Sequence, residues 1–187
     1  RPNRYTCETF FLAVCMPAVK LSATQIQILL GMTAIWGLNW PVMKYAVSQQ
    51  PPMTFRFFCM VLGVFSMWGL AAIMKVDLRI PREKWARVMG LCLPNMIGWH
   101  LLCILAVKEL SSGRAAILGY TMPVWAVLSG LIWKHPVGTR GWIGLAFAML
   151  AALLLLSSEF SAIAGSPTGV LLMCGAAACW GLGTTLI

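Results

Sequence analysis

The sequence predicts an all-helical, polytopic integral membrane protein, and its composition, its long apolar runs and the placement of its charges support this fold class. Of the 187 residues, 60% are hydrophobic and 10% are charged, whereas a soluble domain is about half apolar and about a quarter charged. Mean hydropathy is +0.82, and the nine Trp and seventeen Gly are typical of membrane helices and their interfaces. This composition excludes a single water-soluble core.

Six apolar runs are long enough to be considered as membrane-spanning helices. A helix needs about 20 residues to cross the roughly 30 Å of hydrocarbon in a bilayer. Five runs are complete, and we place them at residues 26–47, 53–74, 85–107, 110–133 and 141–158. A sixth run begins near Thr168 and continues to Ile187. Only short connections remain between the runs.

The basic residues gather on one side of the predicted membrane. Ten of the fourteen precede the first run or lie in the second connection, its flank or the fourth connection: Arg1, Arg4, Lys20, Lys75, Arg79, Arg82, Lys84, Arg87, Lys134 and Arg140. Residues 48–52 carry no charge, and Glu159 is the only charged residue in 159–167. Cytoplasmic loops collect Lys and Arg, so we expect the amino terminus in the cytoplasm. The net charge of +9 then reflects topology and contact with anionic lipid, and no nucleic-acid partner is expected.

No pattern of reactive residues indicates an enzyme. The seven cysteines are odd in number and lack a CxxC pair, which predicts neither a zinc site nor a disulfide framework. The sequence contains no HExxH helix, no GxSxG elbow and no paired carboxylates within a span. We therefore expect no catalytic residues, no metal and no cofactor.

A short internal repeat links the first and sixth runs. Five residues recur 144 positions later: Gly31, Ala34, Trp36, Gly37 and Leu38 correspond to Gly175, Ala178, Trp180, Gly181 and Leu182. An offset of five helices reverses the direction of crossing, so the second copy is expected to be inverted. Inverted repeats are typical of secondary transporters, which hold substrate near the bilayer midplane between the repeats.

Four motifs in order resemble the EamA domain of the drug/metabolite transporter superfamily. They are residues 34–41 (AIWGLNWP), residues 55–57 (FRF), residues 113–116 (GRAA) followed by Pro123, and residues 141–144 (GWIG). The resemblance covers residues 21–160 as one five-helix repeat and residues 165–187 as the opening of a second. Residues 1–20 are then an amino-terminal extension, for which Met16 is a plausible native start.

This resemblance implies a ten-helix carrier of two inverted repeats that moves small organic metabolites or drugs across a bacterial inner membrane. The chain departs from that pattern by ending one helix into the second repeat. Its expected partners are therefore a small organic solute, the lipid bilayer, and either a carboxy-terminal repeat or a second copy of the chain. The alternatives to a carrier working by alternating access are a membrane channel and a non-transporting membrane scaffold.

Three predicted helices contain an interior proline that follows a glycine by four residues. Proline lacks an N–H and clashes with the carbonyl four residues earlier, so the glycine carbonyl is left free. The prolines could serve packing alone, or the helices could bend around a cavity and hinge during transport. The pairs are Gly37 and Pro41, Gly90 and Pro94, and Gly119 and Pro123.

Polar and aromatic residues inside the predicted spans are the candidate substrate-binding residues. Asn39 shares a helical face with Trp36 and Met43 because they are spaced by three and four residues. Each polar residue could instead bond a neighbouring helix. The candidates are Trp36, Asn39, Asn95, Trp99, His100, Arg114 and Tyr120.

Lys44, Arg56 and Arg114 are basic residues near the outer ends of their predicted helices, where the orientation rule disfavours them. They could attract a carboxylate or phosphate, with Arg114 the best candidate, or extend to lipid headgroups. No Asp or Glu lies well inside the first five runs. His100 is therefore the visible candidate for a proton carrier.

Overall fold

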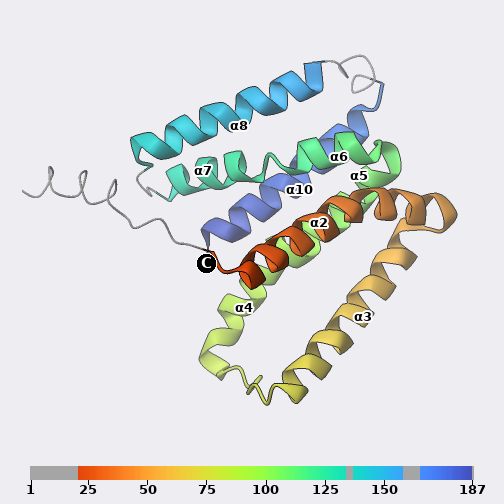
Figure 1. Ribbon diagram of the computed structural model, residues 1–187, viewed down its shortest axis with the longest axis vertical. Coiled ribbons are helices and arrows are strands. Elements are labelled where there is room, and N and C mark those ends of the chain that lie inside the picture. Colours follow the sequence, from red (N-terminus) through yellow and green to blue (C-terminus); the bar gives the residue numbers. More distant parts are fainter. Residues whose placement is uncertain (1–20, 134–136, 158–164, 187) are drawn as a thin grey trace, which may run out of the picture. The chain divides into compact units, whose positions relative to one another are not determined.

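Every regular element in the described part of the chain is a helix. The computed structural model describes residues 21–133, 137–157 and 165–186 (Figure 1). The expected amino-terminal extension with its start at Met16 lies outside these residues, as do the predicted ends at Ser158 and Ile187. The chain divides into two compact units, residues 1–38 and 39–187. The boundary falls within the first long helix, α2 (Ala23–Gln49).

The described part of the first unit is the beginning of α2. Ser22 Oγ accepts a hydrogen bond from the backbone N–H of Gln25 at 3.2 Å, and Gln25 Oε1 accepts one from the backbone N–H of Ser22 at 2.8 Å. This reciprocal pair is a capping box, which satisfies two backbone donors that a helix start leaves open. The local sequence therefore determines where α2 begins.

The second unit contains the end of α2 and all the later helices. Their bounds are Pro52–Ile73 for α3, Trp85–Cys92 for α4, Trp99–Glu109 for α5, Ser112–Gly119 for α6, Met122–Ile132 for α7, Thr139–Ser157 for α8 and Pro167–Thr185 for α10. A 3₁₀ turn, η1 (Arg82–Lys84), precedes α4, and a π-helical turn, η2 (Leu93–Gly98), joins α4 to α5.

Five helical segments in the described residues are long and apolar enough to cross a membrane: 23–49, 52–73, 82–109, 112–132 and 167–185. They correspond to five of the six predicted spans. The remaining predicted span is α8, whose apolar stretch, Gly141–Ser157, is shorter. The prediction of an all-helical, multi-pass membrane protein is confirmed, and the apolar stretch of α8 is shorter than the other five segments.

The end of α3 shows how the chain leaves a helix. Lys75 has a φ of 54°, the left-handed conformation that commonly follows a helix. The Val76 N–H donates to the carbonyl of Ala71 at 2.9 Å, and the Lys75 N–H donates to that of Ala72 at 3.2 Å. These two bonds form a Schellman motif, which satisfies carbonyl groups that the helix would otherwise leave open.

The three interior prolines have different local consequences. Pro94 lies in the π-helical turn η2, a form of helix in which the regular hydrogen-bond ladder is interrupted. Pro123 lies in the first turn of α7, directly after the break at Tyr120 and Thr121 that separates α6 from α7. Around Pro41, by contrast, α2 remains one helix from Ala23 to Gln49. Two of the three sites thus interrupt the α-helix.

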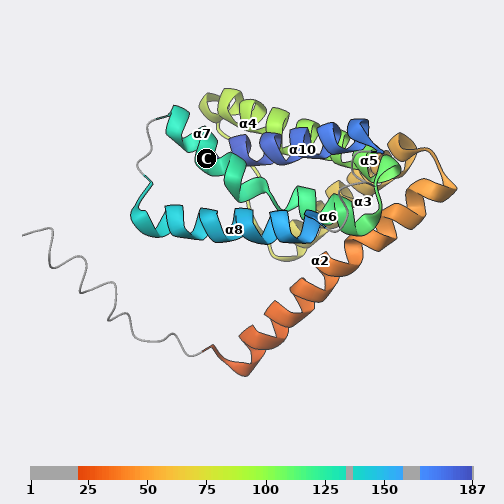
Figure 2. The same ribbon diagram turned by 90° about the horizontal axis from the view of Figure 1, so that it is seen from above.

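Helix α10 packs against several helices of the second unit at once, namely α5, α6, α7 and η2 (Figures 1 and 2). Gly169, near its start, lies against Glu109 and Leu110 at the end of α5, whereas Gly183, near its end, lies against Asn95 in η2. α10 therefore runs antiparallel to α5. The last turns of α2, residues 39–49, also run opposite to α10 in both views, which is the relation that an inverted repeat requires.

The contact between α10 and α7 depends on Gly181. A methyl group at this position would lie 2.6 Å from the backbone nitrogen of Ala126 and 2.7 Å from Trp125 Cβ. Small residues allow membrane helices to approach each other this closely. Gly181 is the repeat counterpart of Gly37, so the second copy of the repeated motif supplies a packing surface.

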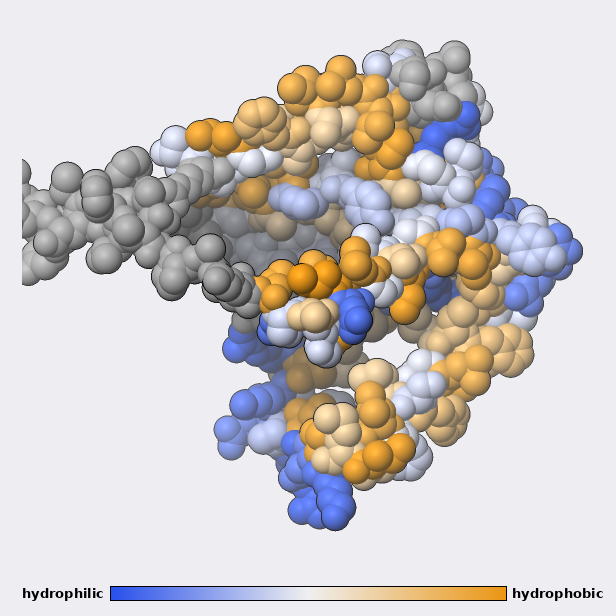
Figure 3. All heavy atoms as spheres, in the orientation of Figure 1, coloured by the Kyte–Doolittle hydropathy of each residue, from blue (hydrophilic) through white to orange (hydrophobic). Residues whose placement is uncertain are grey.

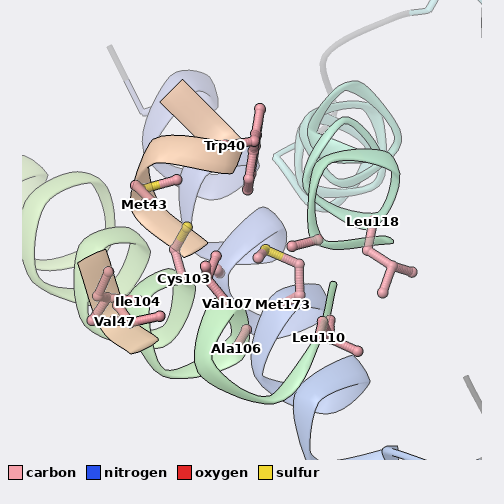
Figure 4. Close-up of a cluster of buried hydrophobic side chains, with 12 residues drawn as sticks. Trp40, Met43, Val47, Cys103, Ile104, Ala106, Val107, Leu110, Leu118 and Met173 are labelled. Carbon is pink, nitrogen blue, oxygen red and sulfur yellow. The ribbon is translucent and has the colours of Figure 1, made fainter. Parts of the chain in front are cut away.

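The buried core of the second unit lies where α2, α5, α6 and α10 meet (Figure 4). Its buried residues are Trp40, Met43, Val47, Cys103, Ile104, Ala106, Val107, Leu110, Ala115, Leu118, Met173 and Ala176. By contrast, α3 has no buried residue, and apolar side chains cover the faces of α3 and α8 that Figure 3 shows. Such large exposed apolar surfaces suit a lipid environment.

Candidate aromatic and cationic binding site

Four aromatic side chains meet where α2, α5, α10 and the break after α6 come together, and we call Trp40, Trp99, Tyr120 and Trp180 the aromatic cluster. Trp40 Nε1 donates a hydrogen bond to the Tyr120 hydroxyl at 3.2 Å, and the two rings meet edge to face with centroids 5.9 Å apart. Trp99 meets Trp180 in a similar arrangement at 5.4 Å. Such pairs prefer edge-to-face geometry and stabilise the contact beyond simple burial.

Gly119 joins the two aromatic pairs. A methyl group here would lie 2.9 Å from Trp40 Cη2 and 3.6 Å from Trp99 Cη2. The absence of a side chain therefore allows both indoles to approach the backbone of α6. Gly90 is different, because a methyl group there would meet no atom within 4 Å. Of these two glycines that precede a proline, only Gly119 is covered by a neighbouring helix.

The predicted asparagine candidates lie in different surroundings. Asn39 is exposed on α2, and its Nδ2 lies 3.8 Å from Met43 Sδ on the same helical face. Asn95 is half-buried in η2, and its side chain lies against Gly183 of α10. Trp36 and Gly37 belong to the first unit. Within the second unit, Asn95 and Trp99 contact α10, and Tyr120 contacts Trp40.

A second group, which we call the cationic cluster, consists of Met43, Arg56, His100 and Cys103. Arg56 Nη2 lies 3.4 Å from Met43 Sδ, and the positive charge of Arg56 acts on both His100 and Cys103. Arg56 Nε and His100 Nδ1 are buried and have no hydrogen-bond partner among the described residues. Met43 and Cys103 also belong to the buried core shown in Figure 4.

The other two basic residues near the outer helix ends have other roles or places. Lys44 Nζ donates hydrogen bonds to the backbone carbonyls of Val107 at 3.0 Å and Lys108 at 2.8 Å. A cation in this position donates to carbonyls that the helix end leaves open, and it interacts favourably with the negative end of the α5 dipole. Arg114 is half-buried in the first turn of α6, where its backbone N–H donates to the N-cap Ser111 Oγ at 3.4 Å.

Sequence reasoning missed Trp40 and ranked Arg56 below Arg114. The repeat drew attention to Trp36, but Trp40 is the tryptophan of α2 that reaches Tyr120. One signal could have found it: Trp40 lies three residues before Met43 and directly before Pro41. Arg56 carried its signal in the FRF motif, where a charge stands between aromatic residues inside an apolar run.

Comparison with known proteins identifies the domain that carries both clusters. Residues 24–157 match the EamA-like transporter family. The chain belongs to this family. The aromatic cluster and the cationic cluster lie in the EamA domain except for Trp180, which α10 contributes from beyond the matched residues.

Three proteins of Bacillus subtilis (strain 168) are similar to this EamA family member. The uncharacterized transporter YoaV is 25% identical over 84% of this chain and 56% of its own length. The uncharacterized transporter YvbV is 27% identical over 88% and 54%, and the uncharacterized transporter YdfC is 25% identical over 66% and 40%. The chain thus spans about half the length of the first two relatives. No solved structure matches it significantly.

The aromatic cluster and the cationic cluster of this EamA domain offer non-covalent contacts. Aromatic surfaces bind apolar groups, and a few well-placed polar groups fix a ligand's orientation. Here the Tyr120 phenol lies against the Trp40 indole, and the Arg56 guanidinium lies beside the Met43 thioether. Among residues 21–133, 137–157 and 165–186, no group of three or more His, Cys, Asp or Glu residues could hold a metal ion.

Proposed function

We propose that the chain forms part of a secondary transporter that moves small organic solutes across the bacterial inner membrane by alternating access. Its family membership and relatives named as transporters support a transport role. The observation that carries the proposal is the aromatic cluster, in which Trp180 of α10 meets Trp99 of α5. Substrates of inverted-repeat carriers bind between the repeats, and α10 is the first helix of the proposed second repeat, so this contact supports a binding role for the rings.

The interrupted helices support movement at the same place. The break at Tyr120 and Thr121 lies beside the contact with Trp40, and the π-helical turn η2 directly precedes Trp99. Helix interruptions near a binding site are typical of transporters, because a few backbone positions can absorb the change between two states. We propose that Gly119, Pro123 and Pro94 serve this movement.

The proposed carrier needs more than this chain's helices. Its relatives extend well beyond the matched part, so we propose a second five-helix repeat that begins with α10, or a second copy of the chain in its place. The excess of basic residues before α2 and between α3 and α4 supports a cytoplasmic amino terminus. Reporter fusions after Gln50 and after Asp77 should give opposite signals, with the Asp77 fusion on the cytoplasmic side.

A flux experiment on the full-length protein tests the transport proposal. Proteoliposomes would be loaded with a defined mixture of isotope-labelled amino acids, organic acids and nucleosides, and the released compounds would be identified by mass spectrometry. A carrier gives saturable release that unlabelled substrate outside accelerates by exchange. Ion conductance without saturation would indicate a channel instead, and neither behaviour would indicate a scaffold.

A further inference from the structure

The guanidinium of Arg56 is short of hydrogen-bond acceptors. It lies in the first half of α3 and is directed towards α2, where Met43 Sδ accepts at 3.4 Å from Nη2. A thioether is only a weak acceptor. Arg56 Nε is buried without any partner among the described residues. The hydrogen-bond acceptor that the described residues offer this guanidinium is therefore a weak one, the sulfur atom of Met43.

A second buried nitrogen in the same cluster is also unpartnered. His100 Nδ1, on α5, has no hydrogen-bond partner among the described residues, and the charge of Arg56 acts on its ring. Buried polar atoms of folded proteins almost always have a partner. Two exceptions on two different helices, close enough to interact, indicate a place for a ligand that satisfies both.

The charge of the cluster indicates which ligand. Arginine stays protonated at any ordinary pH. Arg56 is half-buried, and burying an uncompensated charge is costly, so a negative partner is favoured. Lys44, a cation on the neighbouring helix α2, already donates hydrogen bonds to two carbonyls of α5. One available positive charge suits one negative charge, and the planar guanidinium matches a carboxylate in a two-bond arrangement.

The neighbouring side chains indicate what the carboxylate is attached to. Met43 and Trp40 are three residues apart on α2, and both belong to the buried core (Figure 4). Trp40 in turn donates a hydrogen bond to Tyr120. A carboxylate bound at Arg56 therefore lies beside an apolar core, which favours a ligand whose remaining part is apolar.

We propose that the cationic cluster binds the carboxylate of an amphipathic organic acid, with Arg56 as the anchoring cation and His100 Nδ1–H as a second donor. The claim that this ligand is the substrate of the carrier rests on the proposed function. The claim that the cationic cluster binds a carboxylate does not depend on whether the protein transports anything. The two can therefore be tested apart.

The test measures ligand binding to the full-length protein, reconstituted without detergent in nanodiscs of phosphatidylcholine, a zwitterionic lipid. Its melting temperature is followed by intrinsic fluorescence while sodium benzoate, phenylacetate or indole-3-acetate is added at constant ionic strength. Benzamide, the neutral counterpart of benzoate, is the ligand control. We expect a saturable rise with at least one carboxylate and none with benzamide.

Substitutions locate the site. Arg56→Gln should weaken carboxylate binding about tenfold or more, because a hydrogen bond to a charged group is lost, and Arg56→Lys should retain part of it. Arg79→Gln is the matched control, since it removes the same charge from an exposed position between α3 and α4. Without ligand, Arg56→Gln should melt no lower than the parent protein, because it removes a charge that nothing compensates.

Four results of the ligand experiments would overturn the proposal. They are a melting temperature that none of the three acids changes, an equal rise with benzamide, and an equal loss of the rise in Arg79→Gln. The fourth is a rise caused by adding the anionic lipid phosphatidylglycerol to the nanodisc, with which no acid competes. A lower melting temperature of ligand-free Arg56→Gln would also contradict it, because the charge would then be paired within the full-length chain. Intact binding without flux in proteoliposomes would instead contradict the transport proposal alone.

Discussion

The indole N–H of Trp40, in the second half of α2, donates a 3.2 Å hydrogen bond to the hydroxyl of Tyr120, which lies at the break between α6 and α7. Trp40 is 7% exposed, so water is a poor substitute for this acceptor. The bond therefore links a continuous helix to the point where another helix is interrupted.

Removing the acceptor tests the strength of this link. Tyr120→Phe should destabilise the full-length protein by about 1 kcal/mol, the typical size of a hydrogen bond between membrane helices. The measurement is the melting temperature in detergent. Tyr45→Phe is the matched control, because Tyr45 lies on the same helix as Trp40 and is 70% exposed. Equal melting temperatures for the two variants would mean that the hydroxyl of Tyr120 does not stabilise the fold.

Substitution by alanine should change the stability of the protein differently at the two glycines that precede Pro94 and Pro123. Gly119→Ala places a methyl group 2.9 Å from Trp40, and overpacking of this kind costs about 1–3 kcal/mol. Gly90→Ala meets nothing within 4 Å and replaces glycine by a better helix former, so stability should be unchanged or higher. Thermal unfolding of both variants checks this difference. A Gly119→Ala protein as stable as Gly90→Ala would contradict the placement of Trp40.

Lys44 is predicted to stabilise the end of α5 rather than to bind substrate. Lys44→Met keeps the length of the side chain but removes the donor to Val107 and Lys108, which should cost about 1 kcal/mol. Lys84→Met is the control, because exposed Lys84 lies at the amino-terminal end of α4, where a positive charge is unfavourable. A lower melting temperature with an unchanged KM for transport would support the capping role. A raised KM at constant stability would assign Lys44 to the substrate.

The sequence predicts the membrane helices well because hydrocarbon thickness and helix rise determine the length of an apolar run. The capping box of Ser22 and Gln25 and the Pro167 start of α10 are likewise local. Contacts between helices are not local. Lys44 was assigned to an anion or to headgroups because its carbonyl acceptors lie 63 and 64 residues away in the sequence. Trp40 was missed for the same reason, since its partner is 80 residues away.

The last prediction concerns the antiparallel contact between α5 and α10. A methyl group at Gly175 would lie 3.3 Å from Leu102 Cδ1, so thiols at these two positions should come within reach of a disulfide. We expect Leu102→Cys with Gly175→Cys to cross-link under mild oxidation, in a full-length background without native cysteines, including the seven of this sequence. Leu102→Cys with Leu171→Cys is the control, because Leu171 is 74% exposed on the same helix. Cleavage between the helices followed by gel electrophoresis with and without reductant distinguishes linked from unlinked protein. Cross-linking of the control pair alone would place the wrong face of α10 against α5. If α10 moves against α5 during alternating access, the bond should also stop transport until it is reduced.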